Sequence, residues 1–143
     1  MRRKHPWRWA FGIVVAVLLS AAAFAYYRVN EALRGDYETI LVIQLVEDYV
    51  KMHHGNLPLS WKDLDGTEMA KRLAPLDSSY WRRYTRVDFT LTSEQLVEHP
   101  DMIYQAVTPL SGRYHVYPHA RRDLDGLMQA IRDARRSPTT PAR

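Results

Sequence analysis

The chain has 143 residues, 46% hydrophobic and 25% charged, proportions typical of one folded domain with an appendage and not of a disordered chain. It has no cysteine, which excludes a disulfide framework, a thiolate zinc site and a lipoprotein anchor. Four of its 20 Lys and Arg lie in residues 1–8 and the other 16 balance the 16 Asp and Glu, so the rest lacks the positive face of a nucleic-acid-binding protein.

An uncharged segment of 19 residues, Trp9 to Tyr27, follows the basic arm of residues 1–8. As a helix it would rise about 28 Å, close to the thickness of a bilayer's hydrocarbon core. Tryptophans flank its first end and tyrosines its second, as at membrane interfaces. The basic arm lacks acids whereas the chain after Tyr27 has both charges, so we expect a cytoplasmic N-terminus. The sequence predicts a single-pass inner-membrane protein, with the bilayer as a partner and residues 28–136 outside the cytoplasm.

Residues 1–25 also fit a cleaved signal peptide, with Ala23-Phe24-Ala25 as a small-x-small cleavage site. Against cleavage, apolar residues recur at three- and four-residue spacing from Tyr26 to Tyr37 and lead into a further helix, so one helix would cross the proposed cut. Gly35 is a candidate bend, because a mid-helix glycine costs about 1 kcal/mol relative to alanine. An uncleaved anchor and a soluble exported domain both remain hypotheses.

The region 28–54 is predicted to be an amphipathic helix. From residue 36 to 53 the polar side chains form one stripe, and Val42, Leu45 and Val46 are among the apolar ones that cover the rest. Gly55 is expected to end the helix in a left-handed conformation, since Pro58 follows it. Ser60-Trp61-Lys62-Asp63 has the form of a capping box, so a short second helix should begin at Trp61.

This pattern resembles the type IV pilin-like proteins of type II secretion systems, the pseudopilins. The likeness covers about the first 65 residues and rests on an apolar helix that continues into an amphipathic one, followed by Gly55, Leu57, Pro58, Ser60, Asp63 and Leu64. The resemblance implies a small antiparallel sheet packed against the helix. It also implies a structural subunit of an envelope assembly, which self-associates or binds a protein partner through its N-terminal helix.

The chain beyond residue 80 suits such a sheet. Val87, Phe89 and Leu91 alternate with polar residues, as in a half-buried strand. Residues 103–107 are a second strand candidate and residues 114–116 a third, and these two could form a hairpin. Between the first and second candidates, SEQLVEHP should form one helical turn that ends before its proline.

A closing helix is predicted around Leu124, Leu127, Met128 and Ile131, with a basic end at Arg136. Residues 137–143 are polar and proline-containing, and we expect them to be disordered. The predicted fold class is therefore α+β, with an N-terminal transmembrane and amphipathic helix, a small antiparallel sheet and a C-terminal helix.

Histidines offer the main candidates for chemistry. His53 and His54 are adjacent, so on a helix they would point about 100° apart, and we interpret them as surface residues near a helix end. Pro118 lies between His115 and His119 and should break regular spacing. His99 near Asp101 could be a base with its orienting acid, but no serine or cysteine in a nucleophile motif accompanies it.

Two further motifs have structural interpretations. The segments KDLDG at 62–66 and RDLDG at 122–126 hint at calcium but lack the later ligands of an EF-hand loop, so we interpret both as acidic helix starts. The aromatic cluster Tyr80, Trp81 and Tyr84 is typical of a core or sheet rim. The arginines Arg82, Arg83 and Arg86 are typical of a solvated face, with an anionic partner as the alternative.

We therefore assign no catalytic, cofactor-binding or metal-binding residue and expect no enzyme. The leading hypothesis is a membrane-anchored extracytoplasmic interaction or assembly subunit. The alternatives are a soluble periplasmic domain after cleavage, or a small hydrolase that uses His99 or His115.

Overall fold

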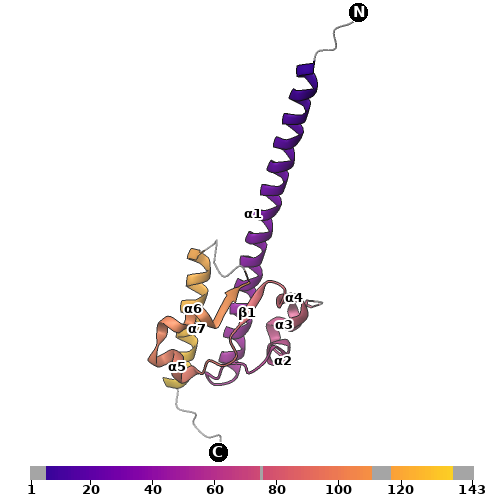
Figure 1. Ribbon diagram of the computed structural model, residues 1–143. Helices are drawn as coiled ribbons and strands as arrows, with labels where there is room; N and C mark the ends of the chain where they lie inside the picture. Colours follow the sequence, from indigo (N-terminus) through magenta and orange to yellow (C-terminus); the bar gives the residue numbers. More distant parts are fainter. Residues whose placement is uncertain (1–5, 75, 111–116, 137–143) are drawn as a thin grey trace, which may run out of the picture.

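The computed structural model describes residues 6–74, 76–110 and 117–136. A long N-terminal helix, a two-stranded antiparallel sheet and a C-terminal helix form an α+β fold, as the sequence predicts (Figure 1). The predicted hairpin strand at 114–116 and the predicted disordered tail at 137–143 lie outside the described residues.

Helix α1 is a single helix of 47 residues, Pro6–Met52. It passes through the proposed cleavage site at Ala25 and through Gly35 without interruption, so the expected segments 9–27 and 28–54 are parts of one element. The Thr39 hydroxyl donates to the Gly35 carbonyl at 2.8 Å, which adds a contact at the glycine. The predicted end at residue 54 is two residues late, because the chain turns after Met52.

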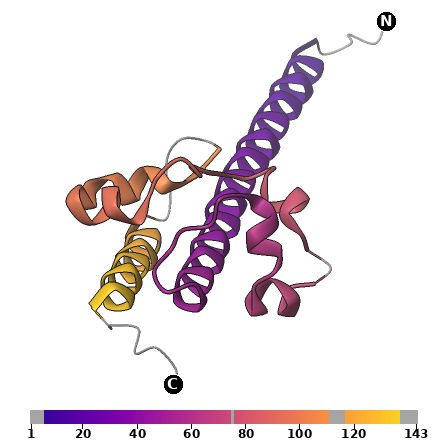
Figure 2. The same cartoon turned by 90° about the horizontal axis from the view of Figure 1, so that it is seen from below.

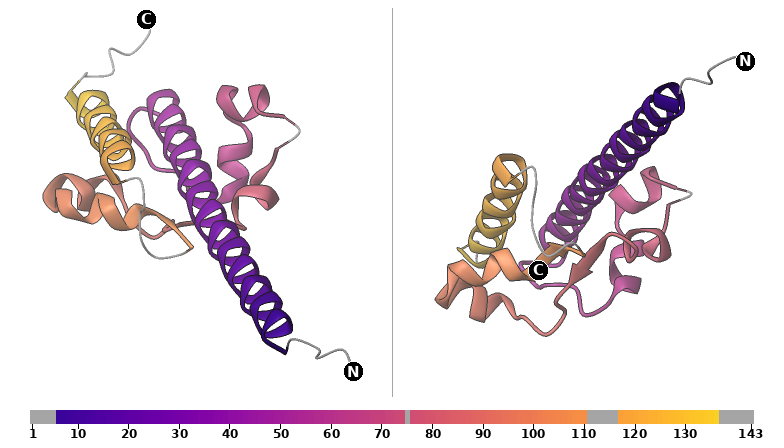
Figure 3. Two further views of the ribbon diagram at one scale, coloured as in Figure 1. Left: turned by 90° about the horizontal axis from the view of Figure 1, so that it is seen from above. Right: turned by 45° about the horizontal axis from the view of Figure 1, so that its top comes forward.

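The other helices are arranged around the second half of α1. One group is α2 (Trp61–Asp65), α3 (Glu68–Arg72) and α4 (Ser78–Trp81); the other is α5 (Ser93–Glu98), the 3-10 helix η1 (Pro100–Met102), α6 (Ile103–Ala106) and α7 (Tyr117–Arg136). The two groups lie on opposite sides of α1 (Figure 2). The first half of α1 projects away from both of them (Figure 3).

The hydrophobic core lies where these groups meet α1. The second half of α1 contributes Val42, Ile43, Leu45, Val46 and Val50, all essentially inaccessible to solvent. Helix α7 contributes Leu124, Leu127, Met128 and Ile131, the four residues that predicted this helix. Trp81, from α4, is the largest fully buried side chain among the described residues. The burial of these apolar surfaces is the main favourable term that holds the domain on α1.

The sheet consists of β1 (Thr85–Val87) and β2 (Val107–Pro109), with Arg86 opposite Thr108. The first predicted strand is too long, because the chain turns after Val87 and an Asp88 carboxylate accepts the backbone N–H of Thr90. The second was wrong over 103–106, which forms α6. Within this turn Ile103 and Ala106, three residues apart, are buried against the core and Gln105 is exposed. The sequence did not show this, because so short a run does not distinguish the strand period from the helical one.

The corner after α1 depends on two consecutive residues with positive φ, His54 at 55° and Gly55 at 87°. The Gly55 N–H donates to the Val50 carbonyl at 2.9 Å, the pattern of a Schellman helix end. The Gly55 carbonyl accepts a hydrogen bond from the buried Ser93 hydroxyl at 2.5 Å. A Cβ on Gly55 would lie 3.0 Å from the Cβ of Ala134 in α7, so the corner also sets how closely α7 can pack.

The hydrogen bonds that cap the helix starts differ from those predicted. Helix α2 begins at Trp61 as expected, but the Ser60 hydroxyl donates to the Asp63 carboxylate, which also accepts the Leu59 N–H, so this is not a capping box. A complete capping box stands at α5, where Thr92 and Gln95 exchange hydrogen bonds. That start carries the Thr-x-x-Gln sequence pattern of a capping box.

Helix α7 begins earlier than predicted, at Tyr117. Contrary to our expectation, Pro118 does not disrupt this helix. It is the second residue of α7, a position in the first turn where proline's missing N–H costs little. The second Asp-Leu-Asp-Gly copy, with Asp123 and Asp125, therefore lies within α7 and is not a helix start.

Replacement of Gly55 by alanine should destabilise the protein. The positive φ costs an L-residue about 1–2 kcal/mol, and the contact with Ala134 adds to this. Gly126→Ala is the matched control, because its Cβ would meet Glu47 Oε2 at 3.6 Å and a mid-helix alanine gains about 1 kcal/mol. Chemical denaturation of the full chain in detergent should give a lower midpoint for G55A and an equal or higher one for G126A. Wild-type stability in G55A would contradict this account of the corner.

Candidate membrane anchor and juxtamembrane site

The first half of α1 is apolar and exposed. By length and composition this helix could cross a membrane, and none of its most apolar stretch is buried against the rest of the protein. Val14, Leu18 and Phe24 are each more than half exposed. The long apolar helix is compatible with a membrane anchor, because lipid would cover the side chains that the domain leaves uncovered.

Burial on α1 begins at Asp36, whose side chain is fully buried. Leu33 and Tyr37, on either side of it in sequence, are still exposed, so one face of the helix enters the domain before the other. Thr39 lies one turn further, and its hydroxyl is 2.9 Å from the Thr85 hydroxyl at the start of β1. Since Thr39 donates to the Gly35 carbonyl, Thr85 is the donor between the two hydroxyls.

A polar network joins α1 to α4 at this point. The Tyr80 hydroxyl donates to Glu38 Oε1 at 2.6 Å and accepts from Arg34 Nη2 at 3.0 Å. The guanidinium of Arg34 also lies 5.5 Å from the ring centroid of Tyr84. The hydrogen bond to Glu38 is the main reason that the pKa of Tyr80 is raised above its ordinary value, with Arg34 opposing it. The network holds α4 and the following strand beside α1 where the helix leaves the domain.

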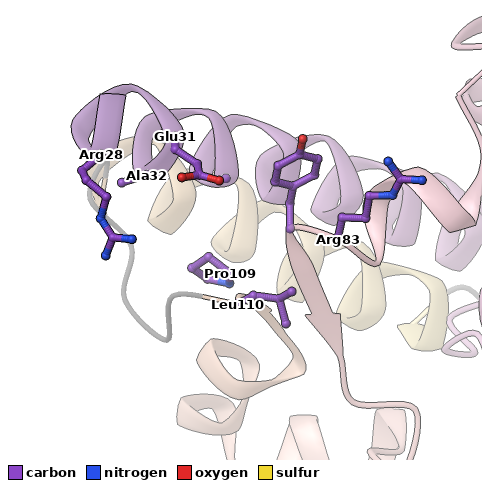
Figure 4. A pocket seen from close by; sticks show the side chains of 8 residues that line it. Arg28, Glu31, Ala32, Arg83, Pro109 and Leu110 are labelled. Atoms are coloured by element: carbon purple, nitrogen blue, oxygen red, sulfur yellow. The ribbon is translucent and has the colours of Figure 1, made fainter. Parts of the chain in front are cut away.

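Next to this network lies a hollow of about 260 Å³ between α1 and the ends of the two strands. We call it the juxtamembrane hollow, and it is lined by Arg28, Glu31, Ala32, Gly35, Arg83, Tyr84, Pro109 and Leu110. Arg28 and Arg83 stand at its opposite ends, with Glu31 on the helix between them and Leu110 below (Figure 4). It therefore offers both charged and apolar surface.

The candidate histidines lie apart. His53 stacks on Tyr49, with ring centroids 3.9 Å apart, and His54 occupies the left-handed position after α1. His99 lies between α5 and η1, and its backbone N–H donates to the Gln95 carbonyl. His119 is exposed near the start of α7, and His115 lies outside the described residues.

The first Asp-Leu-Asp-Gly copy forms hydrogen bonds within the domain. Asp63 caps the start of its own helix, and Asp65 accepts from both the backbone N–H and the hydroxyl of Ser78 at the start of α4. Within the part of the chain that the structure describes, no three His, Asp or Glu side chains are grouped as metal ligands.

The aromatic cluster is divided between core and rim. Trp81 is fully buried, whereas Tyr80 and Tyr84 are half-buried at the α1 junction, with ring centroids 5.4 Å apart. All three candidate arginines are exposed, and Arg82 lies over the Trp61 ring at 5.6 Å. These placements confirm the core and rim interpretation of the aromatic residues.

Sequence reasoning missed the network at Tyr80. Arg34 and Glu38 are spaced i, i+4, which is a signal for a helical ion pair, and their side chains are 3.9 Å apart. Tyr80 lies 42 residues further on than Glu38, so only the fold brings them together.

Comparisons with protein-family models, with curated proteins and with solved structures found no match for this chain.

Tyr80→Phe should lower the free energy of unfolding by about 1 kcal/mol at neutral pH, since one net hydrogen bond to Glu38 is lost. Because the pKa of Tyr80 is higher in the folded protein than in the unfolded chain, the protonated hydroxyl stabilises the fold below about pH 10. This contribution is lost as the pH rises through the pKa that Tyr80 has in the folded protein. Y80F should therefore lose less stability than wild type between pH 8 and pH 11. Tyr37→Phe, at an exposed tyrosine of α1 next to Glu38, is the control and should behave as wild type. Equal alkaline losses in Y80F and wild type would contradict the assigned role.

Proposed function

We propose that this protein is a single-pass membrane protein whose α+β domain lies outside the cytoplasm and serves as an interaction or assembly subunit. The observation that carries the proposal is the division of α1: its first half is apolar and exposed, and its second half is the central core element of the domain. A helix that leaves a domain in this way needs a second apolar environment, and a bilayer supplies one of the right thickness.

Orientation follows from charge. Arg2, Arg3, Lys4 and Arg8 precede the span without an acid, whereas Arg28 and Glu31 mark the mixed charge after it. Lysine and arginine close to a span favour the cytoplasmic side, so the folded domain would face the periplasm or its equivalent.

Pilin-like assembly is the finer form of the proposal. Support comes from the sheet and short helices packed on the second half of a long N-terminal helix, and from the glycine-proline corner at Gly55 and Pro58. Two features of the sequence limit it to a likeness of shape: no prepilin cleavage motif precedes the apolar segment, and no glutamate lies inside it. An anchored subunit that binds its partners through α1 without polymerising fits both.

The soluble alternative requires cleavage after Ala25. The new N-terminus would then leave Tyr26, Tyr27 and Val29 exposed to water on a free helical end, 76%, 61% and 59% accessible respectively. An uncleaved helix places the two tyrosines at the membrane interface instead.

A topology and extraction experiment tests the proposal. A reporter active only in the periplasm, fused after Arg143, should be active, and a cytoplasmic reporter at the same position should be inactive. The fusion should stay in the membrane pellet after alkaline carbonate extraction, and its intact mass should include residues 1–25.

Each failure has a different meaning. An active cytoplasmic reporter would contradict the orientation. Release by carbonate together with loss of residues 1–25 would establish the soluble exported form. Ala25→Leu, which removes a small residue from the cleavage pattern, should change the mass of an anchored protein only by the substitution itself and leave its pellet fraction unchanged.

A further inference from the structure

One face of α1 stays uncovered after the predicted span. Helices α2, α3 and α4 lie on one side of α1 and helices α5, α6 and α7 on the other (Figure 2). The α1 residues that face the domain, such as Thr39, Ile43 and Val46, are buried. On the remaining face, Tyr26 and Tyr37 are 76% and 60% exposed. The described part of the domain therefore leaves a strip of α1 without protein cover.

The uncovered strip carries a regular repeat. We call its residues the α1 seam, and they are Tyr26, Asn30, Leu33, Tyr37 and Ile40. Their spacing alternates between four and three, the seven-residue repeat with which two helices pack along a common line. Tyr26, Leu33 and Ile40 occupy the d positions of this repeat, and Asn30 and Tyr37 occupy the a positions. Ile40 is half-buried but is not among the core residues of the described chain.

Lipid can cover only the beginning of the seam. Tyr37 and Ile40 lie ten and 13 residues after Tyr27. On a helix these residues are about 15 and 20 Å beyond the end of the predicted span. The headgroup layer is only roughly 5–7 Å thick on each side of the hydrocarbon. The apolar surface at Tyr37 and Ile40 therefore needs protein to remove it from water.

Charge and hydrogen bonding favour an identical helix as the partner. The seam contains no charged residue, and the nearby Arg34 is turned to Tyr80 while Asp36 is buried. Because each residue near a two-fold axis meets its own copy, a charged seam would bring like charges together. Asn30 is exposed, and its amide has both a donor and an acceptor, so two copies of it can hydrogen-bond to each other. A single asparagine at an a position favours a parallel dimer in one register.

The repeat continues into the predicted span. Ala16, Leu19 and Ala23 precede the seam at the same spacing. Small residues such as the two alanines let helices approach closely in lipid. At the other end the seam stops, because Gln44 and Asp48 make this face of α1 polar. One line of contact can thus run from the bilayer to the middle of the domain.

We propose that two copies of this chain form a parallel, two-fold dimer along the α1 seam, within the membrane and directly outside it. Each domain lies beside its own helix, and the dimer buries the strip that a single copy leaves in water. This inference rests on the proposed function, because the two helices are parallel only if both chains enter the bilayer in the same direction.

Single cysteines at matched positions test the seam, since the natural chain has no cysteine. Leu33→Cys lies on the seam, and Glu31→Cys is its control: Glu31 is exposed near the same level, about 160° away around the helix. Tyr26→Cys and Arg28→Cys form a second pair with the same geometry. In membranes oxidised with copper-phenanthroline, each seam variant should give about fivefold more disulfide-linked homodimer than its control, because identical d positions face each other.

Tyr37→Arg should break the seam by charge. Tyr37 is exposed in a single copy, so the substitution leaves the domain folded. In the dimer it places two guanidinium groups against each other, and it should lower cross-linking of Tyr26→Cys about fivefold. Glu31→Arg adds positive charge on the opposite face of the helix and is the control, with unchanged cross-linking.

A nitroxide on Leu33→Cys gives an independent measurement. Fully labelled protein should show dipolar broadening between copies, and dilution with an excess of unlabelled chain should remove it. The same dilution separates distances within one chain from distances between copies, so it belongs in every spin-label measurement on α1.

The outcomes separate this inference from the proposed function. Loss of the unmodified chain from the membrane pellet would overturn the anchor, and with it the proposed function. Retention in the membrane with equal cross-linking on and off the seam, or with none, would overturn the two-fold dimer while the anchor stands. Cross-linking of the seam cysteines only to a different protein would overturn it as well.

Discussion

Helix α1 is apolar and exposed in its first half and packed into the core in its second, and the remaining structure depends on this division. Along its 47 residues, α1 changes from apolar on every side to amphipathic. After the uncharged segment, charged side chains appear from Arg28, and burial begins two turns later at Asp36, the first buried residue among those of α1 whose burial is described. Before that point the domain covers little of α1, and after it two groups of helices and the sheet pack on it. The hydrophobic effect acts on the second half of α1 through the protein core, and in the proposed anchor it would act on the first half through lipid.

The junction between these halves is polar and specific. Thr85 donates a hydrogen bond to Thr39, and Tyr80 accepts one from Arg34 and donates one to Glu38; these bonds join α1 to segments more than 40 residues away. Buried or partly buried hydrogen bonds of this kind contribute modest net stability but are costly to break singly, so they fix one arrangement of the domain on the helix. In the proposed anchored form, α1 would then set the orientation of the domain to the bilayer.

Local signals in the sequence were sufficient for some elements. The apolar period of α7, the glycine corner at Gly55 and the start of α2 at Trp61 each depend on residues within one or two turns, and the structure confirms them. Strand predictions failed where packing decides: alternation at 103–107 was compatible with a helical turn, and pairing limits β1 to three residues. The juxtamembrane hollow could not be predicted, because Arg28, Arg83 and Leu110 are distant in sequence and meet only through the fold.

The central claim is that α1 is one uninterrupted helix from the bilayer into the domain core. Spin labels on Leu19→Cys and Tyr37→Cys test it directly, because both residues are exposed and the pair brackets both Ala25 and Gly35. Eighteen residues of helix are five full turns, so the two backbone positions share a face and lie about 27 Å apart. Pulsed dipolar spectroscopy on the reconstituted full chain should give a single narrow distance near this value. A short or broad distribution would show a bend at Gly35, and loss of the dipolar signal through removal of the first label would show cleavage; either result would contradict the account.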